Sequence, residues 1–455
     1  MSPAESPKGE IAILGLGKSG SAAARLLLAD GHRVYVSDAG SAPALEDTAR
    51  QLRDIGAIVD TGGHDLARIA RASRVVVSPG IDPSAAPVAA AREANRPLVS
   101  EIEIALGYLD GTGIIAVTGT NGKTTTTALI GHILRGLGEE TVDAGNIGAP
   151  LSDFARHDQR PDWIALEMSS FQLHDTPSLS PAVGVLTNLS PDHLDRYPSA
   201  ADYYDDKALL FANASDRSRW VLNADDERVQ QMASGKPGRH FGFSVLREAD
   251  AWLDDASGTM NLLGSSLMSR GELNLLGDHN VANALAAALA VSVADERFRT
   301  PSAREGIVAA LRSFNALAHR LEIVGEVNGV QWINDSKATN VSSSQVAIAG
   351  MRRPTILLLG GRHKGEPYTG LADAIRKSVK KIIAYGEAGP IIEKDLEGTV
   401  PIERLGSDFD EVMRRAKESA EPGDAVLMSP ACSSYDMFRN YEERGARFRK
   451  LAMKS

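Results

Sequence analysis

The sequence predicts an α/β protein with three domains, each built around a mostly parallel β-sheet. The chain has 455 residues, which is more than one hydrophobic core usually holds. Strand-like apolar runs alternate with helical stretches along its whole length. Several of these runs are apolar at every position, which is typical of strands buried on both faces of a parallel sheet. We expect the domains to span residues 1–109, 110–316 and 317–455.

The first domain begins with the pattern of a Rossmann-like nucleotide-binding fold. An apolar run at residues 11–14 leads into a glycine-rich turn and a helix, and a second strand at 34–36 is followed by Asp38. In this pattern the turn approaches a diphosphate and the carboxylate binds the nucleoside. The turn residues in question are Gly15, Gly17, Lys18 and Ser19. Both a dinucleotide and a nucleotide sugar carry a diphosphate, so the pattern alone leaves both ligands open. Further strands are expected at 75–78 and 97–100.

The second domain opens with a phosphate-binding loop between a strand at 114–117 and an apolar helix. The loop consists of Gly119, Thr120, Asn121, Gly122, Lys123, Thr124 and Thr125. Its glycines allow backbone N–H groups to point at phosphate oxygens, Lys123 would reach the β- and γ-phosphates, and Thr124 would bind Mg²⁺. Val117 stands where the usual motif has its first glycine, so the loop is a shortened variant. A generic glycine-rich turn is the less favoured reading, because strand, loop and helix follow one another without a break.

Two later strands of the second domain, at 163–167 and 183–188, end in polar residues. Ligands bind at the carboxyl ends of strands in open parallel sheets, so Glu167 is a candidate for holding a cation. The competing interpretation is a glutamate that caps the next helix. His193 could be a structural turn residue, and Lys207 a solvated residue beside Asp205 and Asp206. The segment 271–277 and a helix at 280–294 close this domain.

The third domain has strand candidates at 330–335, 355–361, 381–386 and 424–430, separated by helical stretches. This alternation predicts a second Rossmann-like, doubly wound sheet.

The composition indicates a soluble protein that does not bind nucleic acid. The net charge of −10 argues against a polyanion as the main partner. Cys432 is the single cysteine, which excludes a disulfide within the chain and favours a buried thiol in a reducing compartment. The N-terminus lacks the apolar core of a signal peptide, and no run is long enough to span a membrane. We expect a cytoplasmic monomer without membrane insertion.

The order of motifs along the chain resembles the Mur ligase family. The motifs are GTNGKTT at 119–125, EMSSFQL at 167–173, NLSPDHLDRY at 188–197, Lys207, HNVAN at 279–283, His319-Arg320 and NDSKATN at 334–340. Within that family, SPACSSYD at 429–436 and NYEERG at 440–445 resemble the members that add D-glutamate. The resemblance covers nearly the whole chain.

This resemblance implies an ATP-dependent ligase of peptidoglycan precursor synthesis. ATP would phosphorylate the carboxylate of UDP-N-acetylmuramoyl-L-alanine, and the amine of D-glutamate would attack the acyl phosphate. Lys123, Glu167, His193 and Lys207 would be catalytic. Thr124 would hold a first Mg²⁺, with Glu167 sharing in metal binding, and His193 would bind a second Mg²⁺ whose other ligand is a carbamate formed on Lys207. ATP would also contact Asn280, Asn283, Arg320 and Asp335. Because these residues come from two domains, the resemblance implies that catalysis requires domain closure.

The substrate sites follow from the same resemblance. The nucleotide sugar would contact Gly15, Gly17, Lys18, Ser19, Asp38, Asn146, Ser169 and Gln172. Glutamate would contact Lys337, Thr339, Lys364, Ser434 and Tyr441. The alternatives are a folate polyglutamate synthetase, the alanine-adding Mur enzyme and a non-catalytic nucleotide-binding protein. The preference for D- or L-glutamate stays open at this stage.

Overall fold

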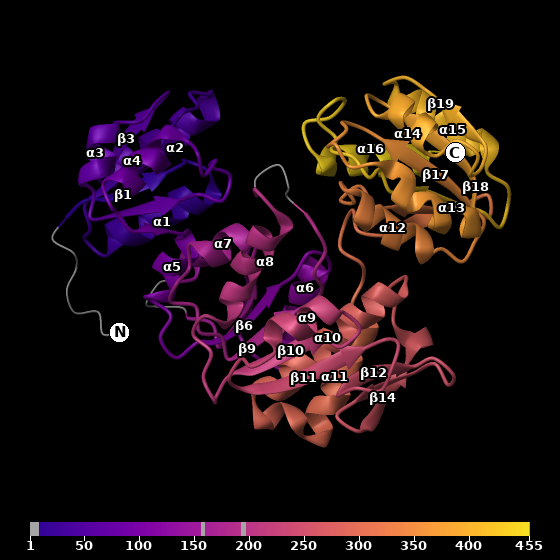
Figure 1. Ribbon diagram of the computed structural model, residues 1–455, viewed down its shortest axis with the longest axis horizontal. Coiled ribbons are helices and arrows are strands. Elements are labelled where there is room, and N and C mark those ends of the chain that lie inside the picture. The colour runs from indigo at the N-terminus through magenta and orange to yellow at the C-terminus, as the bar shows by residue number, and fades with distance from the viewer. Residues whose placement is uncertain (1–8, 156–159, 193–196, 455) are drawn as a thin grey trace. The chain divides into compact units, whose positions relative to one another are not determined.

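The computed structural model describes residues 9–155, 160–192 and 197–454 (Figure 1). The chain divides into two compact units. The first unit comprises residues 1–270 and 282–312, and the second comprises residues 271–281 and 313–455. The first unit contains two sheets and the second contains one. No helix in the described part of the chain is long and apolar enough to cross a membrane.

The N-terminal sheet has five parallel strands in the order β3-β2-β1-β4-β5. The strands are β1 Ile11–Leu14, β2 Val34–Asp38, β3 Ile58–Thr61, β4 Arg74–Val77 and β5 Leu98–Val99. The helices are α1 Lys18–Ala29, α2 Pro43–Asp54, α3 Leu66–Arg71, α4 Ala86–Glu93 and α5 Glu101–Leu106. The strand order reverses between β1 and β4, which places a ligand-binding crevice beside the turn that follows β1. Sequence analysis missed β3, an edge strand whose Ile58 is exposed.

The central sheet has nine strands in the order β14-β13-β12-β11-β10-β9-β6-β8-β7. The strands are β6 Gly113–Thr118, β7 Thr141–Gly145, β8 Trp163–Glu167, β9 Val183–Leu186, β10 Arg219–Asn223, β11 Arg239–Ser244, β12 Ala251–Asp254, β13 Thr259–Leu262 and β14 Ser265–Ser269. Along the sheet from β7 through β8, β6, β9, β10 and β11 to β12, every neighbouring pair is parallel. Strands β12, β13 and β14 form an antiparallel meander. The strands predicted around 114–117, 163–167 and 183–188 are β6, β8 and β9, which are neighbours in the parallel part of this sheet. The sequence analysis did not predict β10, at the middle of the sheet, or β11 beside it.

The helices of this region connect the strands and carry several of the predicted site residues. They are α6 Lys123–Gly136, η1 Leu151–Asp153, α7 Ser170–His174, α8 Ala200–Ala208, η2 Leu209–Phe211, α9 Glu227–Ala233, η3 Arg270–Glu272, α10 Asp278–Ala294, η4 Glu296–Arg299 and α11 Pro301–Ser313. Residues of the N-terminal and central sheets share one continuous hydrophobic cluster within the first unit. Contacts between α5 and η1 contribute to this packing.

The C-terminal sheet has six strands in the order β15-β16-β20-β17-β18-β19, and only β15 is antiparallel to its neighbour. The strands are β15 Glu322–Val327, β16 Val330–Asn334, β17 Thr355–Gly360, β18 Val379–Tyr385, β19 Ile402–Arg404 and β20 Ala425–Met428. The helices are α12 Val341–Ala349, η5 Tyr368–Leu371, α13 Ala372–Ser378, α14 Gly389–Asp395, α15 Phe409–Ser419 and α16 Tyr441–Ala452. Successive residues of a strand, such as Leu357 and Leu358, point to opposite faces of the sheet and belong to two separate hydrophobic clusters. The sheet is therefore covered by helices on both faces, as predicted.

Candidate active site

The phosphate-binding loop connects β6 to α6 and depends on two glycines. Gly119 and Gly122 have φ values of +139° and +82°, a backbone conformation that residues other than glycine rarely adopt. A Cβ atom on Gly119 would collide with the Thr187 hydroxyl, and one on Gly122 would collide with the Asn283 side chain. Both positions therefore require glycine, and the tight turn places the start of α6 at Lys123.

The loop is held by the residues that follow the neighbouring strand β9. Asn188 accepts a hydrogen bond from the Asn121 N–H at 2.8 Å and donates one to the Asn121 carbonyl at 3.0 Å. The Thr120 N–H donates to the Asn188 carbonyl at 2.9 Å. The Lys123 ammonium donates to the Thr120 carbonyl at 2.7 Å, so its charge lies over the loop. Asn188 thus rigidifies the phosphate loop, a role that the sequence pattern did not indicate.

Glu167 ends β8 beside the strand that leads into the phosphate loop, in register with Val117. Its side chain is buried, with 1% of the residue exposed. One carboxylate oxygen accepts a hydrogen bond from the Asn146 amide at 2.9 Å, and the other has no partner among the described residues. A buried oxygen in this state is costly unless a cation or water binds it. Glu167 therefore fits the role of a metal ligand.

The interpretation of Glu167 as a helix cap is wrong. Ser169 is the N-cap of α7, and its hydroxyl accepts from the Gln172 N–H at 3.2 Å. The Gln172 side-chain oxygen in turn accepts a hydrogen bond from the Ser169 N–H at 3.0 Å, which completes a capping box. The two residues predicted to bind the sugar and alanyl portions thus also shape the start of α7.

Lys207 lies on α8 and is buried, with 1% of the residue exposed. Its amine is 3.5 Å from the Thr118 hydroxyl and 4.7 Å from the centre of the Tyr203 ring. Burial is the main cause that lowers the pKa of Lys207 well below its ordinary value, and the positive charge of Lys123 lowers it further. The negative charges of Asp192 and Glu167 oppose this shift. The interpretation of Lys207 as a solvated residue is therefore wrong. A buried amine with a lowered pKa is more often neutral, the form that reacts with carbon dioxide.

Tyr203 was not among the predicted site residues. It is one turn before Lys207 on α8, is 1% exposed, and donates a hydrogen bond from its hydroxyl to that of Thr120 at 3.3 Å. It therefore connects Lys207 to the phosphate loop. His193, the remaining predicted metal ligand, lies outside the described residues.

The oxygen atoms of Thr124 and Glu167 are suitable ligands for a hard cation. Thr124 is half-buried in the first turn of α6, and its hydroxyl and the Glu167 carboxylate are oxygen ligands of the kind that Mg²⁺ prefers. Within the described ranges no three His, Cys, Asp or Glu side chains cluster as a metal site. A Mg²⁺ site here would thus depend on the Thr124 hydroxyl, the phosphates and a modified Lys207 as well as on carboxylates.

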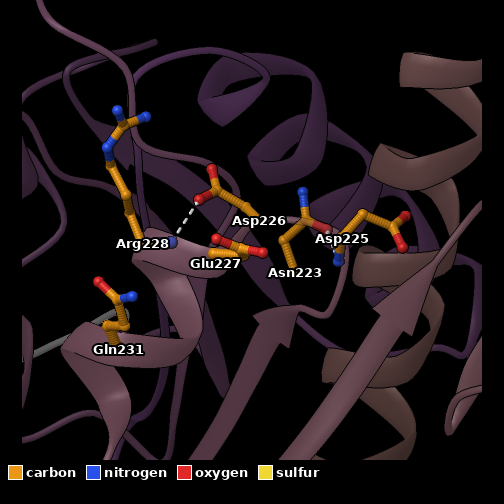
Figure 2. A pocket seen from close by; sticks show the side chains of 6 residues that line it. All are labelled: Asn223, Asp225, Asp226, Glu227, Arg228 and Gln231. Atoms are coloured by element: carbon orange, nitrogen blue, oxygen red, sulfur yellow. Dashed lines mark hydrogen bonds between the residues drawn. The ribbon is translucent and has the colours of Figure 1, made fainter.

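An acidic pocket of about 600 Å³ lies where β10 ends and α9 begins (Figure 2). It is lined by Asn223, Asp225, Asp226, Glu227, Arg228 and Gln231. One oxygen of Asp226 caps α9, and the other accepts the Leu189 N–H at 2.8 Å. Asp226 therefore fixes the start of the loop that follows β9, close in sequence to the predicted metal ligands.

The glycine-rich turn of the N-terminal sheet lies beside the crevice between β1 and β4. Gly15 has a φ of +99°, and a Cβ on it would lie 2.7 Å from the Ser78 hydroxyl at the end of β4. Asp38 accepts the N–H groups of Leu16 and Gly40, each at 2.8 Å. Gly17 and Lys18 are exposed and Ser19 is half-buried at the start of α1. The turn is thus braced by Asp38 and leaves the helix N-terminus accessible to a diphosphate.

The predicted adenosine-side residues are distributed over both units. In the first unit, Asn283 on α10 accepts a hydrogen bond from the Thr126 hydroxyl at 3.2 Å and lies against Gly122. In the second unit, the Asn280 side chain donates to the Leu276 carbonyl at 2.8 Å. Asp335 accepts the Leu321 N–H at 3.1 Å and the Ser429 hydroxyl at 2.7 Å. Burial raises the pKa of Asp335 to about 7, although the hydrogen bonds from Ser429 and Leu321 and the charge of Arg320 lower it.

Asp335 gives a prediction for the pH dependence of stability. Between its ordinary pKa of 3.8 and about 7, the unfolded chain loses a proton that the folded chain keeps. The free energy of unfolding of the second unit should therefore fall as the pH rises through this window, by on the order of 4 kcal/mol at most. Urea unfolding of wild type and Asp335→Asn across this window checks it, because the variant should lose the dependence. An equal slope in both proteins would contradict the assignment.

The predicted glutamate-binding residues lie at the carboxyl ends of neighbouring strands in the second unit. Lys337 follows β16, Lys364 follows β17 and Ser434 follows β20. The Lys337 ammonium lies 3.9 Å from the centre of the Tyr441 ring. Lys364 is exposed, whereas Ser434 is buried and Thr339 is half-buried. The topology thus brings two lysines to one edge of the sheet, where a dicarboxylate could bind.

The loops at this edge are held by Arg444, a buried residue of α16. Its guanidinium donates to the Ser336 carbonyl at 2.8 Å, the Ser336 hydroxyl at 2.9 Å and the Cys432 carbonyl at 3.1 Å. Cys432 is fully buried, as predicted, and burial raises the pKa of its thiol to about 11.

Comparisons with known proteins identify the class. Models of three Mur ligase domains match in order: the MurD-like N-terminal domain at residues 9–100, the middle domain at 117–291 and the glutamate ligase domain at 319–432. The chain therefore belongs to the Mur ligase family.

Full-length relatives indicate the type. The UDP-N-acetylmuramoylalanine–D-glutamate ligase of Salinibacter ruber is 38% identical, with 99% of each chain covered. The protein of the same name from Anaeromyxobacter dehalogenans is 39% identical, with 97% of each chain covered.

Solved structures support the fold. UDP-N-acetylmuramate-alanine ligase from Thermotoga maritima has a TM-score of 0.62 at 18% identity, covering 98% of this chain and 100% of that one. MurF ligase from Thermotoga maritima, solved in complex with ADP, has a TM-score of 0.63 at 16% identity, covering 93% of this chain and 96% of that one.

Proposed function

We propose that this protein is an ATP-dependent ligase that joins D-glutamate to UDP-N-acetylmuramoyl-L-alanine in peptidoglycan precursor synthesis. The observation that carries the proposal is the juxtaposition of the phosphate loop, the half-satisfied carboxylate of Glu167 and the buried amine of Lys207. The names and full-length similarity of its relatives support the choice of substrates. We further propose that it acts as a monomer in the cytoplasm.

In the proposed reaction, an oxygen of the substrate carboxylate attacks the γ-phosphorus of ATP and the bond to ADP breaks. The amine of glutamate then attacks the carbonyl carbon of the acyl phosphate, loses a proton and releases phosphate. Lys123 and the N–H groups of the loop neutralise the charge that moves between phosphates. Bound Mg²⁺ would supply further charge neutralisation. Thr124 and Glu167 are the residues that would hold a first ion, and His193 and a carbamate on Lys207 are those that would hold a second.

The substrate-binding roles extend to the other sheets. The turn from Gly15 to Ser19 would bind the diphosphate of the nucleotide sugar, with Asp38 facing the uracil and Asn146 the sugar. In the second unit, Lys337 and Lys364 would pair with the two carboxylates of glutamate, with Thr339, Ser434 and Tyr441 completing the pocket. Arg320, Asp335, Asn280 and Asn283 would contact ATP.

Phosphate release by the purified protein tests the proposal. With UDP-N-acetylmuramoyl-L-alanine, ATP and Mg²⁺, adding D-glutamate should release phosphate well above a control without an amino acid. L-Glutamate should give little release, which also settles the stereochemistry. Release with UDP-N-acetylmuramate and L-alanine instead would favour the alanine-adding type, and release with a folate would favour a folate polyglutamate synthetase. No release in any mixture would count against a ligase.

A further inference from the structure

One carboxylate in the first unit joins three separate segments. Asp206 on α8 accepts a hydrogen bond from the Tyr197 hydroxyl at 2.7 Å. It also pairs with His174, the last residue of α7, whose Nδ1 lies 2.8 Å from the other carboxylate oxygen. The Asp206 side chain is 17% exposed, whereas that of His174 is 56% exposed, so water screens the pair with His174. Asp206 therefore ties α7 and the residues preceding α8 to α8 itself.

A row of aromatic rings continues from this carboxylate to the Lys207 amine. The Phe171 ring stacks on the Tyr197 ring with centres 5.1 Å apart. The Tyr197 ring meets that of Tyr203 edge-on at 5.5 Å, and the Tyr203 ring is 4.7 Å from the amine of Lys207. Asp206 is thus connected to Lys207 in two ways, along the helix and through Tyr197 and Tyr203.

We propose that Asp206 and Tyr197 are positioning residues that hold α8 and the Tyr203 ring where Lys207 needs them. This inference rests on the proposed function of Lys207. Carbamate formation joins the neutral amine nitrogen to the carbon of carbon dioxide, moves one C–O electron pair onto oxygen and releases a proton to water. The bulkier carbamate fits in place of the amine only if the side chains around Lys207, such as the Tyr203 ring, keep their positions. The hydrogen bond between Tyr197 and Asp206 holds the Tyr197 ring, which in turn packs against the Tyr203 ring.

The hydrogen bond to Tyr197 should matter more than the pair with His174. The His174 side chain is 56% exposed, and an exposed ion pair contributes little. Tyr197, Asp206 and His174 also line a cavity of about 180 Å³. Truncating Tyr197 or Asp206 therefore enlarges an existing space, and the variants should fold.

Four variants of the full chain and one control variant test this inference. Tyr197→Phe removes the donor, Asp206→Ala removes the acceptor, and the double variant removes both. Each single change should lower kcat about tenfold, the size expected for losing a hydrogen bond to a charged group, with KM for ATP unchanged. The double variant should lose no more than either single one, because both changes break the same contact. Asp206→Asn keeps an acceptor and should lie closer to wild type. Asp205→Asn, at the exposed neighbouring position, is the matched control and should not change kcat.

A second readout follows the Lys207 amine without any turnover. Protein incubated with isotopically labelled bicarbonate should give a carbamate signal by NMR in wild type and Asp205→Asn, and a weaker signal in Tyr197→Phe and Asp206→Ala. High bicarbonate should recover part of the lost kcat, which a purely structural defect would not show.

Several results would overturn the inference. One is wild-type kcat and carbamate signal in both Tyr197→Phe and Asp206→Ala. Another is a double variant whose loss is the product of the single losses. A third is equal loss in Asp206→Asn and Asp206→Ala with none in Tyr197→Phe, which would mean that only the charge matters. If wild type itself releases no phosphate, the proposed function fails, and the labelling comparison still decides the inference.

Discussion

Replacing Lys207 by methionine is expected to lower kcat by on the order of a thousandfold, the scale seen when a charge-stabilising group is removed from a reaction centre. Methionine has nearly the same length and fills the same buried space beside Tyr203. It cannot form a carbamate, and its thioether offers no oxygen ligand to a hard cation such as Mg²⁺. The protein should therefore keep its fold while losing the ability to stabilise the charge of phosphoryl transfer.

The same substitution should leave stability unchanged or increase it. A buried amine is costly to fold, as the lowered pKa of Lys207 shows, and methionine removes that cost. In wild type, the unfolded chain binds a proton that the folded chain releases. Wild-type stability should thus rise with pH from the lowered pKa up to about the ordinary lysine value of 10.5, and the variant should lose this contribution.

Phosphate release and thermal unfolding, measured on the same samples, check both expectations. Lys377→Met is the matched control, because it makes the same chemical change at an exposed position in the second unit. It should leave kcat within about twofold of wild type, since surface substitutions rarely matter. An active Lys207→Met protein would remove Lys207 from the proposed mechanism.

The sequence predicted the inner strands of the N-terminal and C-terminal sheets and three neighbouring strands of the central sheet, but it missed several edge strands and the inner strands β10 and β11. Strands β6, β8 and β9 are apolar at nearly every position because both of their faces are buried. The meander strands β12 and β13 alternate buried and half-buried residues over only four positions. Such short alternating runs look like loops, because pairing with a neighbour, rather than local composition, makes them strands.

The site shows a similar division. The phosphate loop is recognisable because its glycines and Lys123 are consecutive, and local backbone geometry explains them. The states of Glu167 and Lys207 depend on burial between segments that are distant in sequence. The position of Glu167 at the end of a buried strand already favoured a cation ligand, whereas the acidic neighbours of Lys207 favoured a solvated residue. Asn188 and Tyr203 act on the loop through contacts across 67 and 83 residues. No spacing rule could have identified them.

Replacing Glu167 by glutamine is expected to lower kcat by about a hundredfold or more and to raise the Mg²⁺ concentration needed for half-maximal activity. Glutamine keeps the carbonyl oxygen that can accept from Asn146, so the side chain should stay in place. It replaces the second oxygen, which has no partner among the described residues, with an amide that cannot bind a cation. Removing a buried charge should also raise the midpoint of thermal unfolding in the absence of Mg²⁺.

Glu101→Gln separates these effects from the general cost of changing a buried carboxylate. Glu101 is 4% exposed, and its carboxylate accepts the Ser152 N–H at 2.5 Å, away from the phosphate loop. This control should keep wild-type kcat and Mg²⁺ dependence. If Glu167→Gln behaved like the control in Mg²⁺ titrations of phosphate release, the unpartnered oxygen would not be a metal ligand. If it lost activity with an unchanged Mg²⁺ requirement, Glu167 would instead act by orienting Asn146 and the start of α7, because those are its other neighbours in the site.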